Sequence, residues 1–154
     1  MKNDIIKQAL DILEKGYVLL GKDDQKNYFE KTIASIKNAS ELVGDNKEKE
    51  VYLVDASVKY ANQLCFILFR DNTLPDSLAE EYRKLPTPEE TSENVKEFTD
   101  ARDARFEELK KQHQVATEEQ KDLDIFLGVI AGMSPEEAAR KMAEHDAQLA
   151  QMRG

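Results

Sequence analysis

The chain has 154 residues, of which 40% are hydrophobic and 34% are charged, and its formal net charge is −9 at pH 7. Such a composition is typical of one folded, water-soluble domain, because disordered chains of high net charge contain far fewer large aliphatic residues. The negative charge argues against direct contact with nucleic acid or an anionic membrane, and it favours a basic protein as partner.

The sequence carries no sign of export or membrane insertion. Its first ten residues lack the continuous apolar run of a secretory signal, and no stretch approaches the roughly 20 apolar residues that a membrane helix needs. The single cysteine, Cys65, lies in an apolar run without a second cysteine to pair with, which fits a reducing compartment. We therefore expect a cytoplasmic protein.

Apolar residues recur every three or four positions in the first two segments, which predicts two amphipathic helices. The first ends near Gly21, and the second begins at an expected cap, Asp23, and ends at Gly44. Because the connection between them is short, we expect an antiparallel helical hairpin. The predicted stripes are Ile6, Leu10, Leu13, Tyr17 and Leu20 in the first helix, and Phe29, Ile33, Ile36, Ala39 and Val43 in the second.

The third segment, residues 47–72, has two apolar stripes, which predicts a helix with two covered faces at the centre of the bundle. Together with the hairpin it forms a three-helix core over residues 1–72. One stripe contains Val51, Val54, Val58, Ala61, Cys65 and Leu68, and the other contains Leu53, Tyr60, Leu64 and Ile67.

Three prolines, at positions 75, 86 and 88, bracket a short helix predicted from Asp76 to Leu85. Proline fixes its own backbone and disfavours helix in the residue before it, so the chain cannot pass this region as one continuous helix. Residues 73–88 are therefore a candidate hinge between residues 1–72 and residues 73–154, which we expect to belong to the same domain.

Three later helix starts share one capping signature, in which a hydroxyl residue is followed three positions later by Glu or Gln. They begin at Thr87, Thr117 and Ser134, and they predict a long helix over 88–115 followed by a helical hairpin. The chain is thus expected to be an all-α bundle of about six to seven helices. Residues 1–72 hold 11 basic against 12 acidic residues, a net of −1, and residues 73–154 hold 11 against 19, a net of −8.

The long helix of residues 88–115 carries five carboxylates at helical spacing on one side. They form a candidate docking strip for a basic partner, or an imitation of a row of nucleic-acid phosphates. The alternative is a solvated face neutralised by interleaved cations at Lys96, Arg102, Arg105, Lys110 and Lys111, and these cations favour that second interpretation. The five strip residues are Glu93, Glu97, Asp100, Asp103 and Glu107.

Residues 126–142, FLGVIAGMSPEEAARKM, resemble the start of helix-turn-helix units in resolvases and sigma-like regulators, where a helix ends in Gly and a short capped helix follows. The resemblance implies a turn and a DNA-reading helix after Met142. Residues 143–148, AEHDAQ, contain no turn residue and two acidic ones, so we expect a continued helix and no direct nucleic-acid contact. The apolar stripe of this C-terminal helix, with Met142, Leu149 and Met152, is a candidate surface for a partner or a homodimer.

No enzyme motif is complete in this sequence. Di-iron bundles use Glu-x-x-His, but neither histidine has Glu three positions before it. Glu90-x-x-Glu93 and Glu97-x-x-Asp100 resemble the magnesium ligands of all-helical pyrophosphohydrolases of the MazG type, yet they lie on one helix and cannot converge on a single ion. No phosphate-binding loop is present, so we expect no catalytic residue, cofactor or metal.

The leading hypothesis is a non-enzymatic adaptor or binding protein that contacts another protein through an acidic helical surface. One alternative is a small inhibitor or immunity protein that blocks a basic nuclease or a nucleic-acid-binding complex by charge mimicry. Another is a helical enzyme without a recognisable motif.

Overall fold

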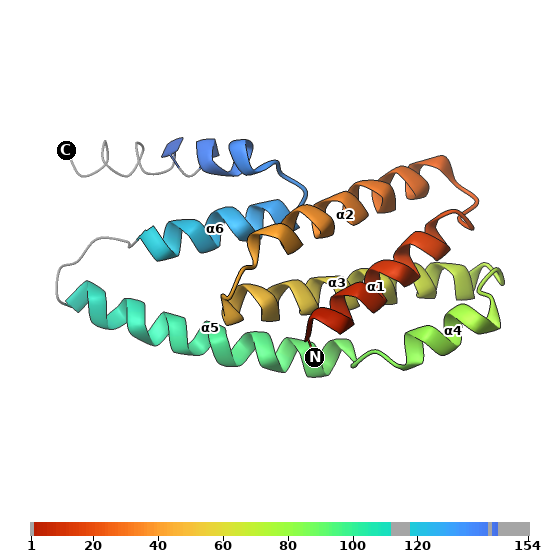
Figure 1. Ribbon diagram of the computed structural model, residues 1–154, viewed down its shortest axis with the longest axis horizontal. Helices are drawn as coiled ribbons and strands as arrows, with labels where there is room; N and C mark the ends of the chain where they lie inside the picture. Colours follow the sequence, from red (N-terminus) through yellow and green to blue (C-terminus); the bar gives the residue numbers. More distant parts are fainter. Residues whose placement is uncertain (1, 112–117, 142, 145–154) are drawn as a thin grey trace.

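The computed structural model describes residues 2–111, 118–141 and 143–144, and these residues form six helices and no strand (Figure 1). Residues 135–141 and 143–144 are also helical. The prediction of an all-α bundle is confirmed. The helices are α1 (Lys2–Tyr17), α2 (Asp23–Leu42), α3 (Lys47–Arg70), α4 (Asp76–Arg83), α5 (Pro88–Lys111) and α6 (Glu118–Ile130).

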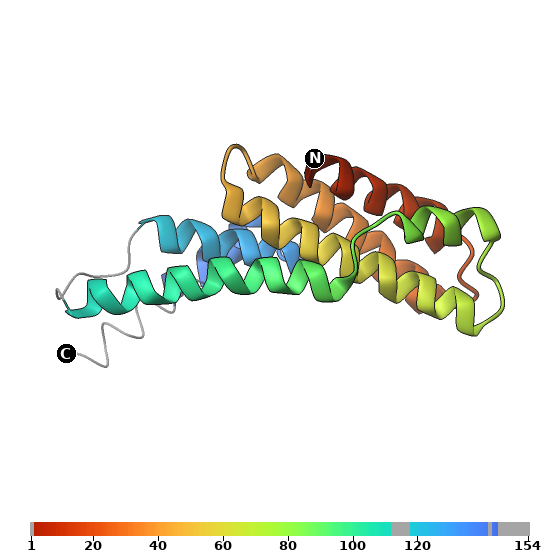
Figure 2. The same ribbon diagram turned by 90° about the horizontal axis from the view of Figure 1, so that it is seen from below.

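Helix α3 lies at the centre, because each of the other five helices packs against it (Figure 2). Both apolar stripes expected for this helix are buried apart from Tyr60, which is half-buried. The sequence-based prediction of a central helix with two covered faces is therefore confirmed.

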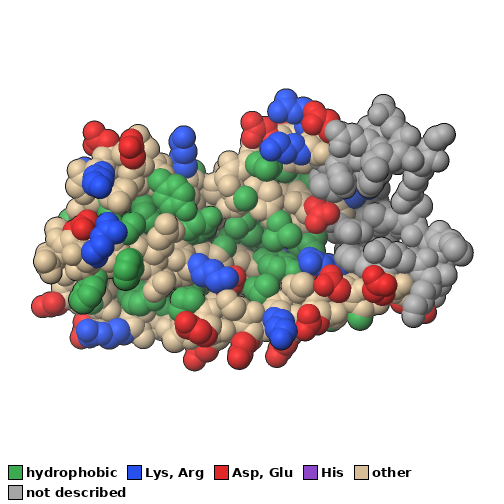
Figure 3. Space-filling model, turned by 180° about the vertical axis from the view of Figure 1, so that it is seen from behind, with side chains coloured by type: hydrophobic (Ala, Val, Ile, Leu, Met, Phe, Trp, Pro, Cys, Tyr) green, Lys and Arg blue, Asp and Glu red, His purple; other side chains and the backbone are tan. Residues whose placement is uncertain are grey.

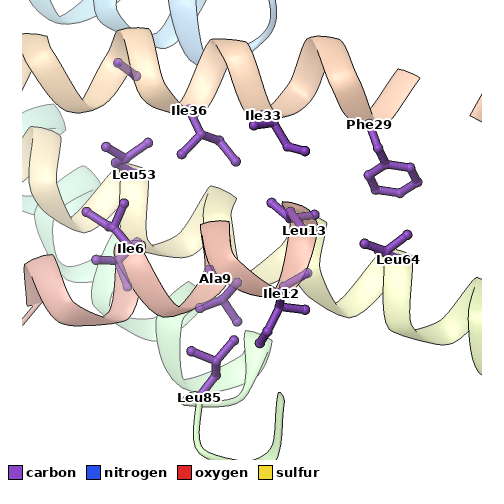
Figure 4. Close-up of a cluster of buried hydrophobic side chains, with 14 of the residues drawn as sticks. Ile6, Ala9, Ile12, Leu13, Phe29, Ile33, Ile36, Leu53, Leu64 and Leu85 are labelled. Atoms are coloured by element: carbon purple, nitrogen blue, oxygen red, sulfur yellow. The ribbon is translucent and has the colours of Figure 1, made fainter. Parts of the chain in front are cut away.

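The hydrophobic core is built mainly from α1, α2 and α3 (Figure 4). The stripe expected on α2 is entirely buried. The stripe expected on α1 matches the buried face of that helix only in part. Ala9 and Ile12 of α1 are buried, while Leu10 and Tyr17 are only partly buried. The reason is that α1 packs against α3 and α4 as well as α2, so its buried face is wider than a hairpin alone requires.

Gly16 permits the close approach of α1 to α3 and α4. A Cβ atom at this position would lie 2.8 Å from Leu64 Cδ2 and 3.2 Å from Leu78 Cδ2. Both leucines are buried and have little room to move. The absence of a side chain at Gly16 therefore sets how tightly these three helices pack.

The two halves of the chain share one core. Leu78 and Leu85, together with Leu123, Phe126 and Val129 of α6, belong to the same buried cluster as the N-terminal helices. The candidate hinge at residues 73–88 includes α4, which packs on α1 and α3. None of the described helices is both long and apolar enough to cross a membrane.

Local capping chemistry sets the start of α5. The backbone N–H of Thr87 donates to Glu90 Oε2, and the Glu90 N–H donates to Thr87 Oγ1, each over 3.2 Å, which completes the expected capping box. The expected cap at Asp23 is wrong. Helix α2 begins at Asp23 after an extended Lys22 without a side-chain cap, and Asp23 instead places its charge in the first turn, where the helix dipole favours it.

The segment that resembles a helix-turn-helix forms a close helical hairpin. Gly132 has a φ of 105°, and its N–H donates to the Val129 carbonyl while the Met133 N–H donates to the Gly128 carbonyl, each over 3.0 Å. This is a Schellman end. A Cβ atom at Gly128 would lie 3.0 Å from Ala138 Cβ, so these small residues let α6 and residues 135–141 pack closely.

Candidate partner-binding surface on the acidic helix

The start of α5 is clamped to α3 by a buried carboxylate. Asp55 Oδ1 accepts hydrogen bonds from the hydroxyls of Thr91, at 2.8 Å, and Ser92, at 3.4 Å. Lys59 Nζ lies 2.9 Å from Asp55 Oδ2, and the Asp55 side chain is only 13% exposed. Because a buried charge needs compensating partners, these contacts hold α5 in one position against α3.

A second group of polar contacts holds the middle of α5. The Tyr52 hydroxyl lies 2.9 Å from Thr99 Oγ1. The guanidinium of Arg102 lies 5.8 Å from the centre of the Tyr52 ring and 3.5 Å from Glu48 Oε1. With the clamp at Asp55, these contacts fix the rotation of α5 about its own axis, since all the residues that α5 contributes lie on one side of it.

The rotation of α5 directs the candidate acidic residues to solvent. All five are exposed, so the structure brings together the strip that the spacing predicts. In Figure 3, acidic side chains follow the lower edge of the molecule, where α5 runs. We call this set the acidic strip, and its members are Glu93, Glu97, Asp100, Asp103 and Glu107.

The acidic strip is less neutralised than the sequence suggests. Arg102, one of the expected compensating cations, has a side chain only 17% exposed and is directed inward to Glu48, although its Nε also lies 3.9 Å from Asp103. Within the described part of the chain, Glu93, Glu97 and Asp100 form no ion pair. Lys96 and Arg105 are exposed, and the side chains of Lys110 and Lys111 lie outside the described residues.

The surroundings of α5 leave the acidic strip accessible. Within the described residues, α5 and α6 do not pack against each other, because α6 attaches to α2 and α3. Lys49 holds α6 through an ion pair with Asp122, and its Nζ lies 5.5 Å from the centre of the Phe126 ring. Figures 1 and 2 show the C-terminal half of α5 extending past the start of α3.

The remaining predicted site residues, Met142, Leu149 and Met152, lie outside the described residues. Cys65 is buried, and burial raises the pKa of its thiol to about 11, so the thiol stays protonated near neutral pH. Among the described residues, no three His, Cys, Asp or Glu side chains are grouped closely enough to hold a metal ion.

The sequence pattern did not predict a second exposed surface, which lies at the C-terminal end of α3. Phe66 and Phe69 are 62% and 70% exposed. Both residues fall outside the two apolar stripes predicted for this helix, and that departure is the signal that could have identified them. Large aromatic residues three positions apart, away from the buried faces of a helix, indicate a further apolar surface.

Comparison with protein-family models, with curated proteins and with solved structures gave no match to this chain.

Proposed function

We propose that this chain is a non-enzymatic, cytoplasmic binding protein that docks a basic partner protein on the acidic strip of α5. The observation that supports this proposal best is the exposure of five carboxylates on one side of a helix, three of which have no ion-pair partner within the described residues. Like charges held together on a fixed helix raise the local negative potential and attract a cationic surface.

The dimensions of the acidic strip suit a protein partner. From Glu93 to Glu107 the helix rises about 21 Å at 1.5 Å per residue. A single exposed ion pair contributes only about 0–1 kcal/mol, so several carboxylates must act together. We expect charge to raise the association rate and to make the affinity depend strongly on salt.

A second candidate function is inhibition of a basic nuclease or nucleic-acid-binding protein. The regular recurrence of carboxylates favours it, because they follow one another about every 5 Å along the helix and so form a linear row of negative charge. A competing DNA duplex should displace the chain from such a target. The same duplex should not displace the chain from a basic partner that does not bind nucleic acid.

The test is affinity capture on the purified chain, with bound proteins identified by mass spectrometry at low and at high salt. The strip variant is Glu97→Lys with Asp100→Lys. Glu30→Lys with Glu41→Lys, two exposed positions on α2, changes the net charge equally away from the strip and is the matched control. We expect a basic protein to bind the wild type and the control, to be lost from the strip variant and to elute with salt.

Two results would reject the proposal. One is that no protein is retained by the wild type. The other is that the strip variant retains the same proteins as the control, because binding would then not depend on the position of the carboxylates.

A further inference from the structure

An apolar groove of about 600 Å³ lies between α3 and α4, at the end of the molecule away from the projecting half of α5. Its walls contain the two most exposed large hydrophobic side chains of the described residues, Phe66 and Phe69. Figure 3 shows hydrophobic side chains exposed among charged ones across the rear face of the molecule. The groove is lined by Asn62, Cys65, Phe66, Phe69, Asn72, Leu74, Asp76, Ala79, Tyr82 and Arg83.

Contacts between α3 and α4 fix the two walls of the groove relative to each other. Helix α3 ends at Arg70, and Asn72, two residues further on, has a φ of 58° that lets the chain turn sharply toward α4. The Tyr82 hydroxyl donates to Asn62 Oδ1, which ties the far end of α4 to α3. Leu78 of α4 is buried in the core and anchors this helix to the rest of the bundle. The groove is therefore part of the folded chain and needs no rearrangement to accept a ligand.

The exposure of the walls favours a macromolecule over a small molecule. Small-molecule sites cover most of the surface of their ligand, whereas Phe66 and Phe69 keep more than half of their own surface in water. A groove between two helices is suited to receiving side chains from another helix.

The charges along α4 are complementary to those of a second α4. Asp76 and Arg83 line the groove at its two ends, and Ala79 lies near the midpoint between them. Within the described residues Asp76 has no ion pair, and Arg83 has only a 3.6 Å contact with Glu80 in which both side chains are at least 70% exposed. A two-fold axis near Ala79 would place each Asp76 against the Arg83 of the other copy.

We propose that a second copy of this chain docks in the groove about such a two-fold axis, with the two α4 helices antiparallel. Ala79 allows the helices to approach closely, and Phe66 and Phe69 of each copy fill apolar space between the walls of the other. This dimer does not involve the acidic strip, so the experiments that test it are independent of the proposed function. It would present two strips at once to a partner, which strengthens binding when both engage.

The size of the surface predicts a dimer of moderate affinity. A stable interface usually involves about 20–30 residues on each side, and the groove itself has ten. We therefore expect a dissociation constant on the order of 10 µM, with the exposed phenylalanines as the anchors.

The first experiment is sedimentation velocity of the full chain from about 1 to about 200 µM, a range that spans the expected dissociation constant. The wild type should pass from monomer to dimer, and Phe66→Ala with Phe69→Ala should weaken the dimer by about 100-fold. Leu42→Ala removes an exposed hydrophobic side chain on α2, outside the groove, and should leave the dimer unchanged. A wild type that stays monomeric, or a dimer that survives the double phenylalanine variant, would overturn the proposal.

The second experiment exchanges the two charges. Asp76→Arg alone, or Arg83→Asp alone, places like charges across the two-fold axis and should weaken the dimer by about 10-fold. The double variant Asp76→Arg with Arg83→Asp restores opposite charges and should bring the affinity back to within about 3-fold of the wild type.

This recovery cannot arise from a more stable monomer, because the exchange places charges unfavourably at both ends of the α4 dipole. Circular dichroism and thermal unfolding of each variant check that the fold is retained. A double variant as weak as either single variant would overturn the antiparallel arrangement.

Discussion

Helices α3 and α5 each contain 24 residues and lie against each other, but different forces hold them in the molecule. Leu53, Val58 and Leu64 of α3 are almost completely removed from solvent, whereas Thr91 is the one fully buried side chain among those described in α5. Burying an aliphatic side chain contributes about 1.5–3 kcal/mol, while one hydrogen bond contributes about 0.5–1.5 kcal/mol. Hydrophobic packing therefore stabilises α3, and a few specific polar contacts position α5.

The difference separates stability from surface function. A helix held by a small number of inward polar contacts leaves most of its surface free, and the sequence of that surface is not constrained by packing. In α5 this free surface carries the acidic strip. In α3 the exposed positions lie mainly toward the C-terminal end, where they include Phe66 and Phe69.

The largest effect on stability is expected in α3. Leu53 is fully buried against the core, so Leu53→Ala should lower the free energy of unfolding by about 3 kcal/mol through lost burial and the cavity that remains. Phe66→Ala, on the exposed side of the same helix, should cost less than about 1 kcal/mol at concentrations where the chain is monomeric. Urea denaturation measures both values, and equal losses would contradict the contrast.

The buried face of α3 should also protect its thiol. Burial raises the pKa of the Cys65 thiol from its usual 9.0 to about 11, so the thiolate fraction at pH 8 is about 100-fold lower than in the unfolded chain. Alkylation of the native protein should be slower than alkylation of the urea-unfolded protein by at least that factor. The reaction rates, followed by mass spectrometry, test this, and similar rates in the two states would show that Cys65 is accessible.

The attachment of α5 should be broken by one substitution. Asp55→Ala removes the carboxylate that accepts from Thr91 and Ser92, leaves the Thr91 hydroxyl only the Pro88 carbonyl, and should cost about 2 kcal/mol. Lys59→Ala removes only the half-exposed cation and should cost less than about 1 kcal/mol. Hydrogen exchange should show faster opening of α5 in the first variant while α1 to α3 stay protected. Uniform loss of protection would mean that α5 is as integral to the core as α3.

The smallest stability effect is expected on the acidic strip. Glu97→Gln with Asp100→Asn removes two exposed charges without an ion-pair partner in the described part of the molecule, so the free energy of unfolding should change by less than about 0.5 kcal/mol. Urea denaturation at low salt measures this change in the free energy of unfolding. A loss above about 1 kcal/mol would indicate that these carboxylates serve the fold rather than a partner.

The amino-acid sequence by itself determined where most of the helices form and how several of them begin. The capping box of Thr87 and Glu90, the cap at Ser134 and the buried stripe of α2 were all predictable, because each depends on residues within a few positions of one another. The placement of five carboxylates on one side of α5 followed from spacing for the same reason.

Only the tertiary structure decided how these helices are rotated and which ones meet. It turned Arg102 inward to Glu48, paired Asp55 with the start of α5, and left Phe66 exposed beside α4. These outcomes depend on contacts between segments far apart in the chain, and helical periodicity defines an apolar face without specifying which neighbour covers it. The local pattern therefore specified the helices, and the packing of distant segments specified which of their surfaces remain exposed.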